Sequence, residues 1–181
     1  MNGINTLRLR EVREERKISL RQLAAEVGLS PALISQVERG LTTPSLDTLR
    51  KLARALDEPL FNLLDEPEKT QVALVRRERR LSLTPPGGDV AYARISPGFG
   101  RLEVLEGVLQ PGDSSAPAPW AHPSEECAVV LEGELTAVVE AQTYTLFTGD
   151  SIYFDSRLPH LFRNQSSHRT TYIVAVTPPS Y

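Results

Sequence analysis

Residues 19–40 (SLRQLAAEVGLSPALISQVERG) constrain the fold of this chain most, because they read as two short helices joined by a tight turn. In the first half, apolar residues recur at i, i+3, i+4 and i+7, which predicts a half-buried helix. Ser19 and Gln22 have the spacing of a capping box at its start. Gly28 suits the left-handed position that often ends a helix, so the first helix is expected between Ser19 and Gly28.

A second helix is predicted directly after this turn. Ser30 can cap it, and Pro31 takes the first helical position, where a missing N–H costs nothing. Its apolar side consists of Leu33, Ile34 and Val37. Its other side carries short or hydrogen-bonding groups, at Ala32, Ser35, Gln36 and Arg39. That side suits a helix pressed against base edges in a major groove, and it also suits the solvated face of an ordinary helical hairpin.

The residues in detail resemble the helix-turn-helix of the phage-repressor-like, xenobiotic-response-element class of bacterial regulators. The match runs from about residue 9 to residue 64, through Arg13 and the motifs SLRQLA, VGLS, ISQVERG and PSLDTLRKLARAL. The resemblance implies a five-helix bundle over residues 1–64 that binds double-stranded operator DNA. Further helices are expected over residues 4–16, 45–56 and 59–64.

The DNA-contacting residues expected on this basis lie on the two central helices. They are Arg21, Gln22, Ser30, Pro31, Ala32, Ser35, Gln36 and Arg39. Ala32, Ser35 and Gln36 should face base edges, with Gln36 suited to a bidentate contact with adenine. Arg21, Gln22 and Arg39 should mainly contact phosphates.

Charge is distributed unevenly along the chain, whose formal net charge is −3. Residues 1–64 contain ten Lys or Arg and eight Asp or Glu, a balance of +2, whereas residues 65–181 contain ten and fifteen, a balance of −5. The positive excess therefore lies with the predicted helices. It is small, so helix N-termini and backbone amides must supply part of any phosphate binding.

The cellular compartment follows from what the sequence lacks. No run approaches the roughly 18 apolar residues of a membrane span, and the first residues have no apolar core for export. Cys127 is the only cysteine, which excludes intramolecular disulfides and favours a reducing compartment. We expect a cytoplasmic protein without membrane association.

The second half of the chain has a different pattern. Residues 65–71 (DEPEKTQ) read as a linker, and eleven of the fourteen prolines lie after residue 64. Short segments rich in Val, Ile, Thr, Tyr and Leu then recur between turn residues, which predicts an antiparallel barrel or sandwich over residues 72–181. The expected strands are residues 72–76, 91–95, 102–109, 128–131, 134–140, 143–147, 151–154 and 170–176. The run RRERR at 76–80 reads as a solvated strand edge or as a second phosphate contact.

Two spacings in this half carry chemistry. They are His122-x3-Glu126-x6-Gly133 and Gly149-x10-His160-x3-Asn164. They resemble the two motifs of the cupin superfamily, small jelly-roll barrels that hold a ligand or metal in the mouth. The resemblance implies an α plus all-β chain of two domains, with the helical bundle first and a cupin second.

This chain departs from the cupin pattern at one expected metal-ligand position. A histidine usually stands two residues before the position of His122, and this chain has Trp120 there. His122, Glu126 and His160 can still hold a divalent metal such as zinc with positions left open. Alternatively, the same groups hydrogen-bond an organic effector without metal.

Further residues are expected around this site, whether it holds a metal or an organic effector. The expected effector-binding set is Tyr92, Trp120, His122, Glu126, Tyr153 and His160. His122 and Glu126, four residues apart on one predicted strand, should face the same side, while Cys127 should project to the opposite face. His168, in the polar run NQSSHR, is expected in a solvated loop.

A helix-turn-helix followed by one cupin resembles bacterial one-component transcription regulators. The resemblance implies a non-enzymatic sensor whose barrel binds a small molecule and whose helices bind an operator. One such helix reads only about four or five base pairs, so a homodimer on a two-fold site is expected, with the cupin as the dimer interface. The alternatives are a metal-dependent enzyme of oxygenase type fused to a DNA-binding domain, and a cupin that serves only for dimerisation.

Overall fold

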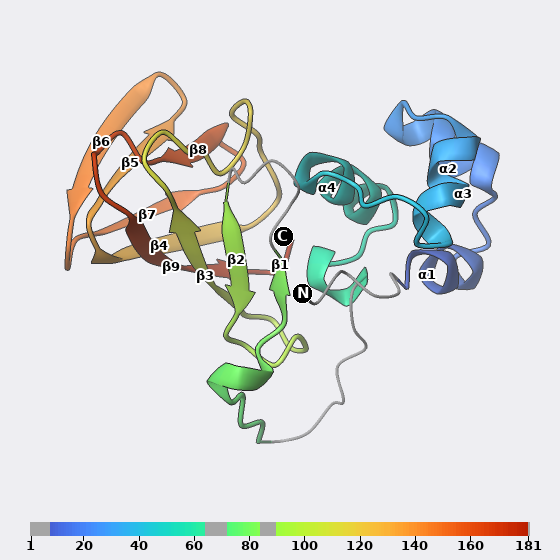
Figure 1. Ribbon diagram of the computed structural model, residues 1–181, viewed down its shortest axis with the longest axis horizontal. Coiled ribbons are helices and arrows are strands. Elements are labelled where there is room, and N and C mark those ends of the chain that lie inside the picture. Colours follow the sequence, from blue (N-terminus) through green and yellow to red (C-terminus); the bar gives the residue numbers. More distant parts are fainter. Residues whose placement is uncertain (1–7, 64–71, 84–89, 181) are drawn as a thin grey trace. The chain divides into compact units, whose positions relative to one another are not determined.

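The computed structural model describes residues 8–63, 72–83 and 90–180, which fall into two compact units (Figure 1). One unit lies within Met1–Glu68 and the other within Lys69–Ser180. The predicted linker at residues 65–71 lies outside the described residues. Among the described residues, no helix is long and apolar enough to cross a membrane.

The first unit is helical. Its α-helices are α1 (Leu9–Glu15), α2 (Leu20–Val27), α3 (Pro31–Glu38) and α4 (Leu46–Ala55). The expectation of five α-helices is wrong for the described residues, because the segment after Pro59 forms a short 3-10 helix, η1 (Leu60–Leu63). There the Asn62 N–H donates to the Pro59 carbonyl at 2.9 Å, a three-residue closure. One tight turn is all that this four-residue segment forms.

The helix ends follow from side chains close in sequence. The Gln22 N–H donates to Ser19 Oγ at 3.2 Å while the Ser19 N–H donates to Gln22 Oε1 at 2.8 Å, which confirms the capping box. Gly28 ends α2 with a φ of 69°. Ser30 Oγ accepts from the Leu33 N–H at 3.1 Å and so caps α3. The predicted turn between the two helices is confirmed.

A buried ion pair joins the ends of α1 and α3. Arg13 Nε and Nη2 lie 2.6 and 3.1 Å from the two carboxylate oxygens of Glu38. Arg13 Nη1 also donates to the Ile18 carbonyl at 2.9 Å. The pair fixes α3 against α1, beside a core in which Leu23, Ile34 and Leu49 are fully buried.

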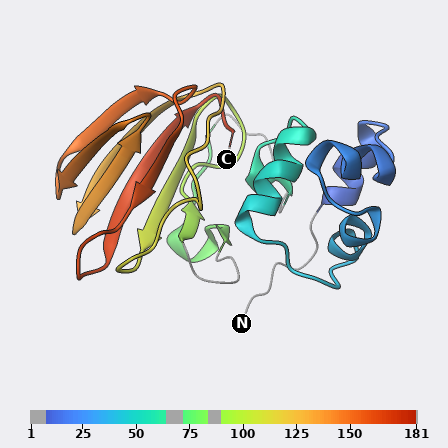
Figure 2. The same cartoon turned by 90° about the horizontal axis from the view of Figure 1, so that it is seen from above.

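The second unit is built from antiparallel strands in two sheets (Figure 2). The strands are β1 (Ser82–Leu83), β2 (Ala91–Arg94), β3 (Glu103–Leu109), β4 (Glu125–Glu132), β5 (Glu134–Val139), β6 (Gln142–Phe147), β7 (Ser151–Asp155), β8 (His160–Arg163) and β9 (Thr170–Thr177). One sheet has the order β1-β2-β3-β9-β4-β7 and the other the order β6-β5-β8. Aromatic side chains pack between the two sheets, since the ring centroids of Phe162 on β8 and Tyr172 on β9 are 5.3 Å apart. The inner faces of the two sheets form the core of the barrel.

Three details of the strand prediction are corrected. Residues 72–76 form no strand, and Val72 and Leu74 are 88% and 72% exposed. The run RRERR forms a 3-10 turn, η2 (Arg77–Arg79), rather than a strand edge. The sequence pattern missed β1, which has two residues, and β8, in which three consecutive buried residues hide the usual alternation.

Candidate functional site

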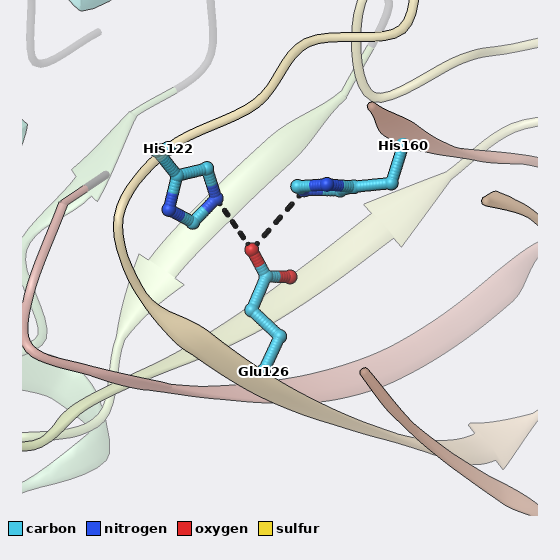
Figure 3. A group of neighbouring side chains, drawn as sticks. All are labelled: His122, Glu126 and His160. Carbon is cyan, nitrogen blue, oxygen red and sulfur yellow. Dashed lines mark ion pairs between the residues drawn. The ribbon is translucent and has the colours of Figure 1, made fainter. Parts of the chain in front are cut away.

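His122, Glu126 and His160 meet inside the barrel, and all three side chains are buried (Figure 3). Glu126 is on β4 and His160 begins β8. The prediction that His122 shares the strand of Glu126 is wrong, because β4 begins at Glu125. Pro123 has no N–H for a sheet ladder, and it separates His122 from β4. His122 is instead anchored by its own N–H, which donates to the Ser156 carbonyl at 2.9 Å.

One carboxylate oxygen is the centre of this cluster. Glu126 Oε1 lies 2.6 Å from His122 Nε2 and 3.2 Å from His160 Nε2. The three candidate ligand atoms all lie within 4.8 Å of one another. The expected convergence of the three side chains is therefore present in the structure.

The charge of Glu126 sets the electrostatics of the site. Burial by itself raises the pKa of this carboxyl, but hydrogen bonds and charge from His122 and His160 outweigh burial and lower the pKa to about 2. Glu126 is therefore ionised at neutral pH. A buried carboxylate is stable only with a compensating positive charge, which a protonated imidazole or a metal ion in the cluster would supply.

The chemistry of the donor set fits a divalent metal. His160 Nδ1 lies 2.8 Å from the Leu158 carbonyl, which can only accept, so Nδ1 carries a proton and Nε2 faces the cluster. Metal-binding histidines commonly donate their second ring nitrogen in this way. Two imidazoles and a carboxylate are ligands that zinc and iron accept, and three protein ligands leave positions open.

Aromatic rings surround the cluster. The centroid of Trp120 lies 4.4 Å from that of His122 and 5.8 Å from that of His160. Phe154 on β7 lies 4.9 Å from His160. The indole N–H of Trp120 is only a donor, so Trp120 cannot replace the histidine ligand expected at its position. These rings reduce the access of water to the donor atoms.

The structure does not bring both predicted tyrosines to the cluster. Tyr153 is 65% exposed and is paired with Cys127 on the outer face of the sheet, whereas Phe154 is paired with Glu126 on the inner face. Tyr92 is buried, and its hydroxyl lies 3.1 Å from that of Tyr172. The strand register aligns Tyr92 with Val130, which lies four residues along β4 from Glu126, roughly 13 Å in the strand direction. Tyr92 is also three strands away from β4 in the sheet.

Sequence reasoning missed three residues of the site. Alternation along β7 would have placed Phe154 inside once Tyr153 was outside. Ser124 and Ser180, which contact each other and the surroundings of His122, stand out in no motif. Two placements are confirmed, because Cys127 is on the outer face and His168 is exposed.

Most of the predicted DNA-reading face of α3 is exposed to solvent. Ile34 and Val37 are buried, whereas Ala32, Gln36 and Arg39 are exposed and Ser35 is half-buried. The remaining predicted contact residues are also exposed, namely Arg21 and Gln22 on α2 and Ser30 and Pro31 at the start of α3. Contact with DNA by any of them stays a prediction.

Comparison with known proteins gives two family matches. The helix-turn-helix family matches residues 9–63, and the cupin domain family matches residues 105–176. The transcriptional regulator PuuR of Escherichia coli K12 is 28% identical over 176 residues, which cover 96% of this chain and 95% of PuuR.

Solved structures extend the comparison. A crystal structure of an HTH_3 family transcriptional regulator from Vibrio cholerae has a TM-score of 0.74 and 25% identity, over 95% of this chain and 93% of that one. Iron(II)-bound HppE has a TM-score of 0.50 and 21% identity, over 93% and 95% of the two chains. The second likeness concerns the fold alone.

Proposed function

This chain belongs to the helix-turn-helix transcriptional regulators that carry a cupin domain, and we propose that a ligand in its barrel controls operator binding by α2 and α3. The ligand site is the cluster of His122, Glu126 and His160. A divalent metal held there would offer open coordination positions to a donor atom of a small-molecule effector.

The convergence of the three donor atoms is the observation that supports this proposal best. Two imidazoles and an ionised carboxylate come from separate segments of the chain and meet in a buried space. Burying a carboxylate among side chains that do not carry a permanent positive charge is costly for a purely structural core. A bound cation offsets this cost, which makes the cluster sensitive to what is dissolved around the protein.

The proposed DNA contacts divide by chemistry. Gln36 would read an adenine through its amide, with Ala32 and Ser35 against neighbouring base edges. Arg21, Gln22 and Arg39 would contact phosphates, and the start of α3 at Ser30 and Pro31 would approach the backbone with its N-terminal dipole. Phosphate contacts fix the register, whereas base contacts supply specificity.

A homodimer is part of the proposal. A single recognition helix reads only about four or five base pairs, so specificity requires two copies on a two-fold operator. The outer face of the six-stranded sheet supplies a suitable surface, since paired positions there carry apolar side chains. These include Val104, Cys127, Val129, Ile173 and Ala175. Tyr153 lies on the same face and is 65% exposed. Sedimentation of the full chain should detect a dimer at micromolar concentration, and a monomer contradicts this part of the proposal.

The central experiment compares the wild type with His160→Ala and with His168→Ala, a control in an exposed loop. Genome-wide mapping of DNA bound by the purified protein first supplies an operator. Metal analysis after purification without chelator should then find metal in the wild type and the control and little in His160→Ala. Removal and return of Zn²⁺ or Fe²⁺ should change the operator affinity of the wild type and of His168→Ala, but not that of His160→Ala. An unchanged response in a folded His160→Ala protein would remove the sensory role from this cluster.

The same ligand set favours one competing function. Two histidines and one carboxylate with open positions are also the iron site of non-heme oxygenases. Oxygen consumption by the iron-loaded protein, abolished by His160→Ala, would support an enzyme. Metal-dependent operator affinity without oxygen consumption would support the regulator.

A further inference from the structure

The segment that follows β9 returns to the metal-site candidate and contacts His122. Ser180 Oγ lies 2.6 Å from His122 Nδ1 and 2.8 Å from Ser124 Oγ. Ser124 Oγ in turn donates to the Pro178 carbonyl at 2.7 Å. A continuous hydrogen-bonded chain therefore runs from a backbone carbonyl, through two serines, to the ring of His122.

The direction of each hydrogen bond in this chain is fixed. The Pro178 carbonyl can only accept, so Ser124 uses its single hydroxyl proton on it. The contact between the serines must then be donated by Ser180, whose one proton is used there. Ser180 Oγ can only accept from the imidazole, so His122 Nδ1 must carry a proton.

The proton on Nδ1 determines what His122 presents to the cluster. With its proton on Nδ1, His122 can offer the Nε2 lone pair to a metal ion; without metal, the 2.6 Å contact between Nε2 and the Glu126 Oε1 carboxylate oxygen needs a second proton, on Nε2. His160 is set in the same way by the Leu158 carbonyl. Two unrelated backbone carbonyls thus impose the same tautomer on both histidines, and both Nε2 atoms face one carboxylate.

We infer that Ser180 and Ser124 are positioning residues that hold His122 in the orientation and Nδ1–H tautomer required of a metal ligand. This inference rests on the proposed metal site, and it makes residues 178–180 part of that site although they lie far from its motifs in sequence. Ser124 is buried, which keeps the relay away from competing water. Donors of this kind around a metal ligand fix ring orientation and raise ligand basicity.

The proton on Nδ1 is tested first, in metal-free protein labelled with 15N at histidine. Long-range 1H–15N spectra should show a protonated Nδ1 in both His122 and His160. Ser180→Ala and Ser124→Ala should reduce the fraction of His122 that carries a proton on Nδ1 and leave that of His160 unchanged. A wild-type His122 with its proton on Nε2 alone would overturn the inference.

Zinc affinity, measured by competition with a chelator, is the second readout. Ser180→Ala and Ser124→Ala should each weaken Zn²⁺ binding by about 10–100-fold, and Ser180→Thr, which keeps the hydroxyl, should restore it. Ser167→Ala is the matched control, because Ser167 Oγ contacts the Nδ1 of exposed His168 at 3.0 Å. Unchanged tautomer and unchanged affinity in Ser180→Ala contradict the inference. The expected tautomers in a wild type that binds no Zn²⁺ would support it and contradict the proposed metal.

Discussion

Each unit of this protein buries a glutamate beside nitrogen donors, but the two arrangements differ in the source of the positive charge. In the helical unit, Glu38 receives a bidentate contact from Arg13 at 2.6 and 3.1 Å, and the third contact of that guanidinium goes to the Ile18 carbonyl. The hydrogen bond with Glu38 raises the pKa of Arg13 despite burial, so the positive charge is permanent. In the barrel, Glu126 faces two imidazoles, which are positive only when they are protonated.

This difference separates a structural ion pair from a candidate ligand site. The Arg13–Glu38 pair is complete within the protein, because both charged partners are its own side chains. The cluster around Glu126 needs a cation that exchanges with solvent, either a proton or a metal ion. Buried charge alone therefore does not identify a functional site, whereas buried charge that depends on an exchangeable cation marks a candidate for one.

The largest expected effect is the loss of one partner of the permanent pair. Arg13→Met leaves the Glu38 carboxylate buried without its guanidinium, which should cost about 3–5 kcal/mol of unfolding free energy. The double variant Arg13→Met, Glu38→Leu should recover much of this loss, because no charge remains to be desolvated. Urea unfolding followed by far-ultraviolet circular dichroism measures the effect.

The barrel provides the control for this experiment. Trp120 is the only tryptophan of the chain and lies in the barrel, so its fluorescence follows that unit. The fluorescence transition should stay at the wild-type urea concentration in both Arg13 variants. A double variant that is as unstable as Arg13→Met would show that lost packing of Arg13, and not the stranded charge, is responsible.

The second prediction concerns acid. The folded-state pKa of Glu126 is about 2, below the ordinary value of 4.5, so its contribution to stability is present above about pH 4.5 and is lost as pH falls toward 2. The size of this contribution is on the order of 3 kcal/mol. Urea unfolding of the metal-free protein at pH 7, 5 and 3, followed by Trp120 fluorescence, should show the decline.

Glu126→Gln should flatten this pH dependence, whereas Glu132→Gln, at an exposed position of the same strand, should preserve it. An equally steep acid profile in Glu126→Gln would assign the effect to other carboxyls.

The helical unit could be predicted in detail because its signals are local. Ser19 and Gln22, or Ser30 and Leu33, lie three residues apart, so the hydrogen bonds that begin α2 and α3 are visible in the sequence. The error concerned the last segment, where periodicity does not distinguish one 3-10 turn from an α-helix. Local chemistry therefore predicted both the helices and the turn between them.

The barrel could be predicted only in outline. Motif spacing identified His122, Glu126 and His160 through the cupin resemblance, but strand register decides whether Tyr153 or Phe154 faces them, and a slip of one residue reverses the answer. Ser180 reaches His122 across 58 positions of sequence. No periodicity or motif encodes such a contact, because it depends on how β4 and β9 pair.

The third prediction tests whether α3 makes both base contacts and phosphate contacts with DNA. Gln36→Ala should cost about 1–3 kcal/mol on the operator and little on random DNA, because an adenine contact is lost. Arg39→Ala should weaken binding to both and reduce the salt slope by about one unit. Both residues are exposed, so neither change should move the unfolding transition of the helical unit. Intact operator discrimination in Gln36→Ala would mean that this face does not read bases.

The smallest expected effect concerns a cap at the start of the same helix. Ser30→Ala removes the oxygen that accepts from the Leu33 N–H, which should cost about 1 kcal/mol of unfolding free energy in the helical unit alone. Ser30→Asn should retain most of the stability, since asparagine caps helices about as well as serine. Circular dichroism during urea unfolding measures both variants beside Arg13→Met. A loss in Ser30→Ala as large as that in Arg13→Met would show that the local cap stabilises this unit as much as the buried ion pair between α1 and α3, and would contradict this ranking.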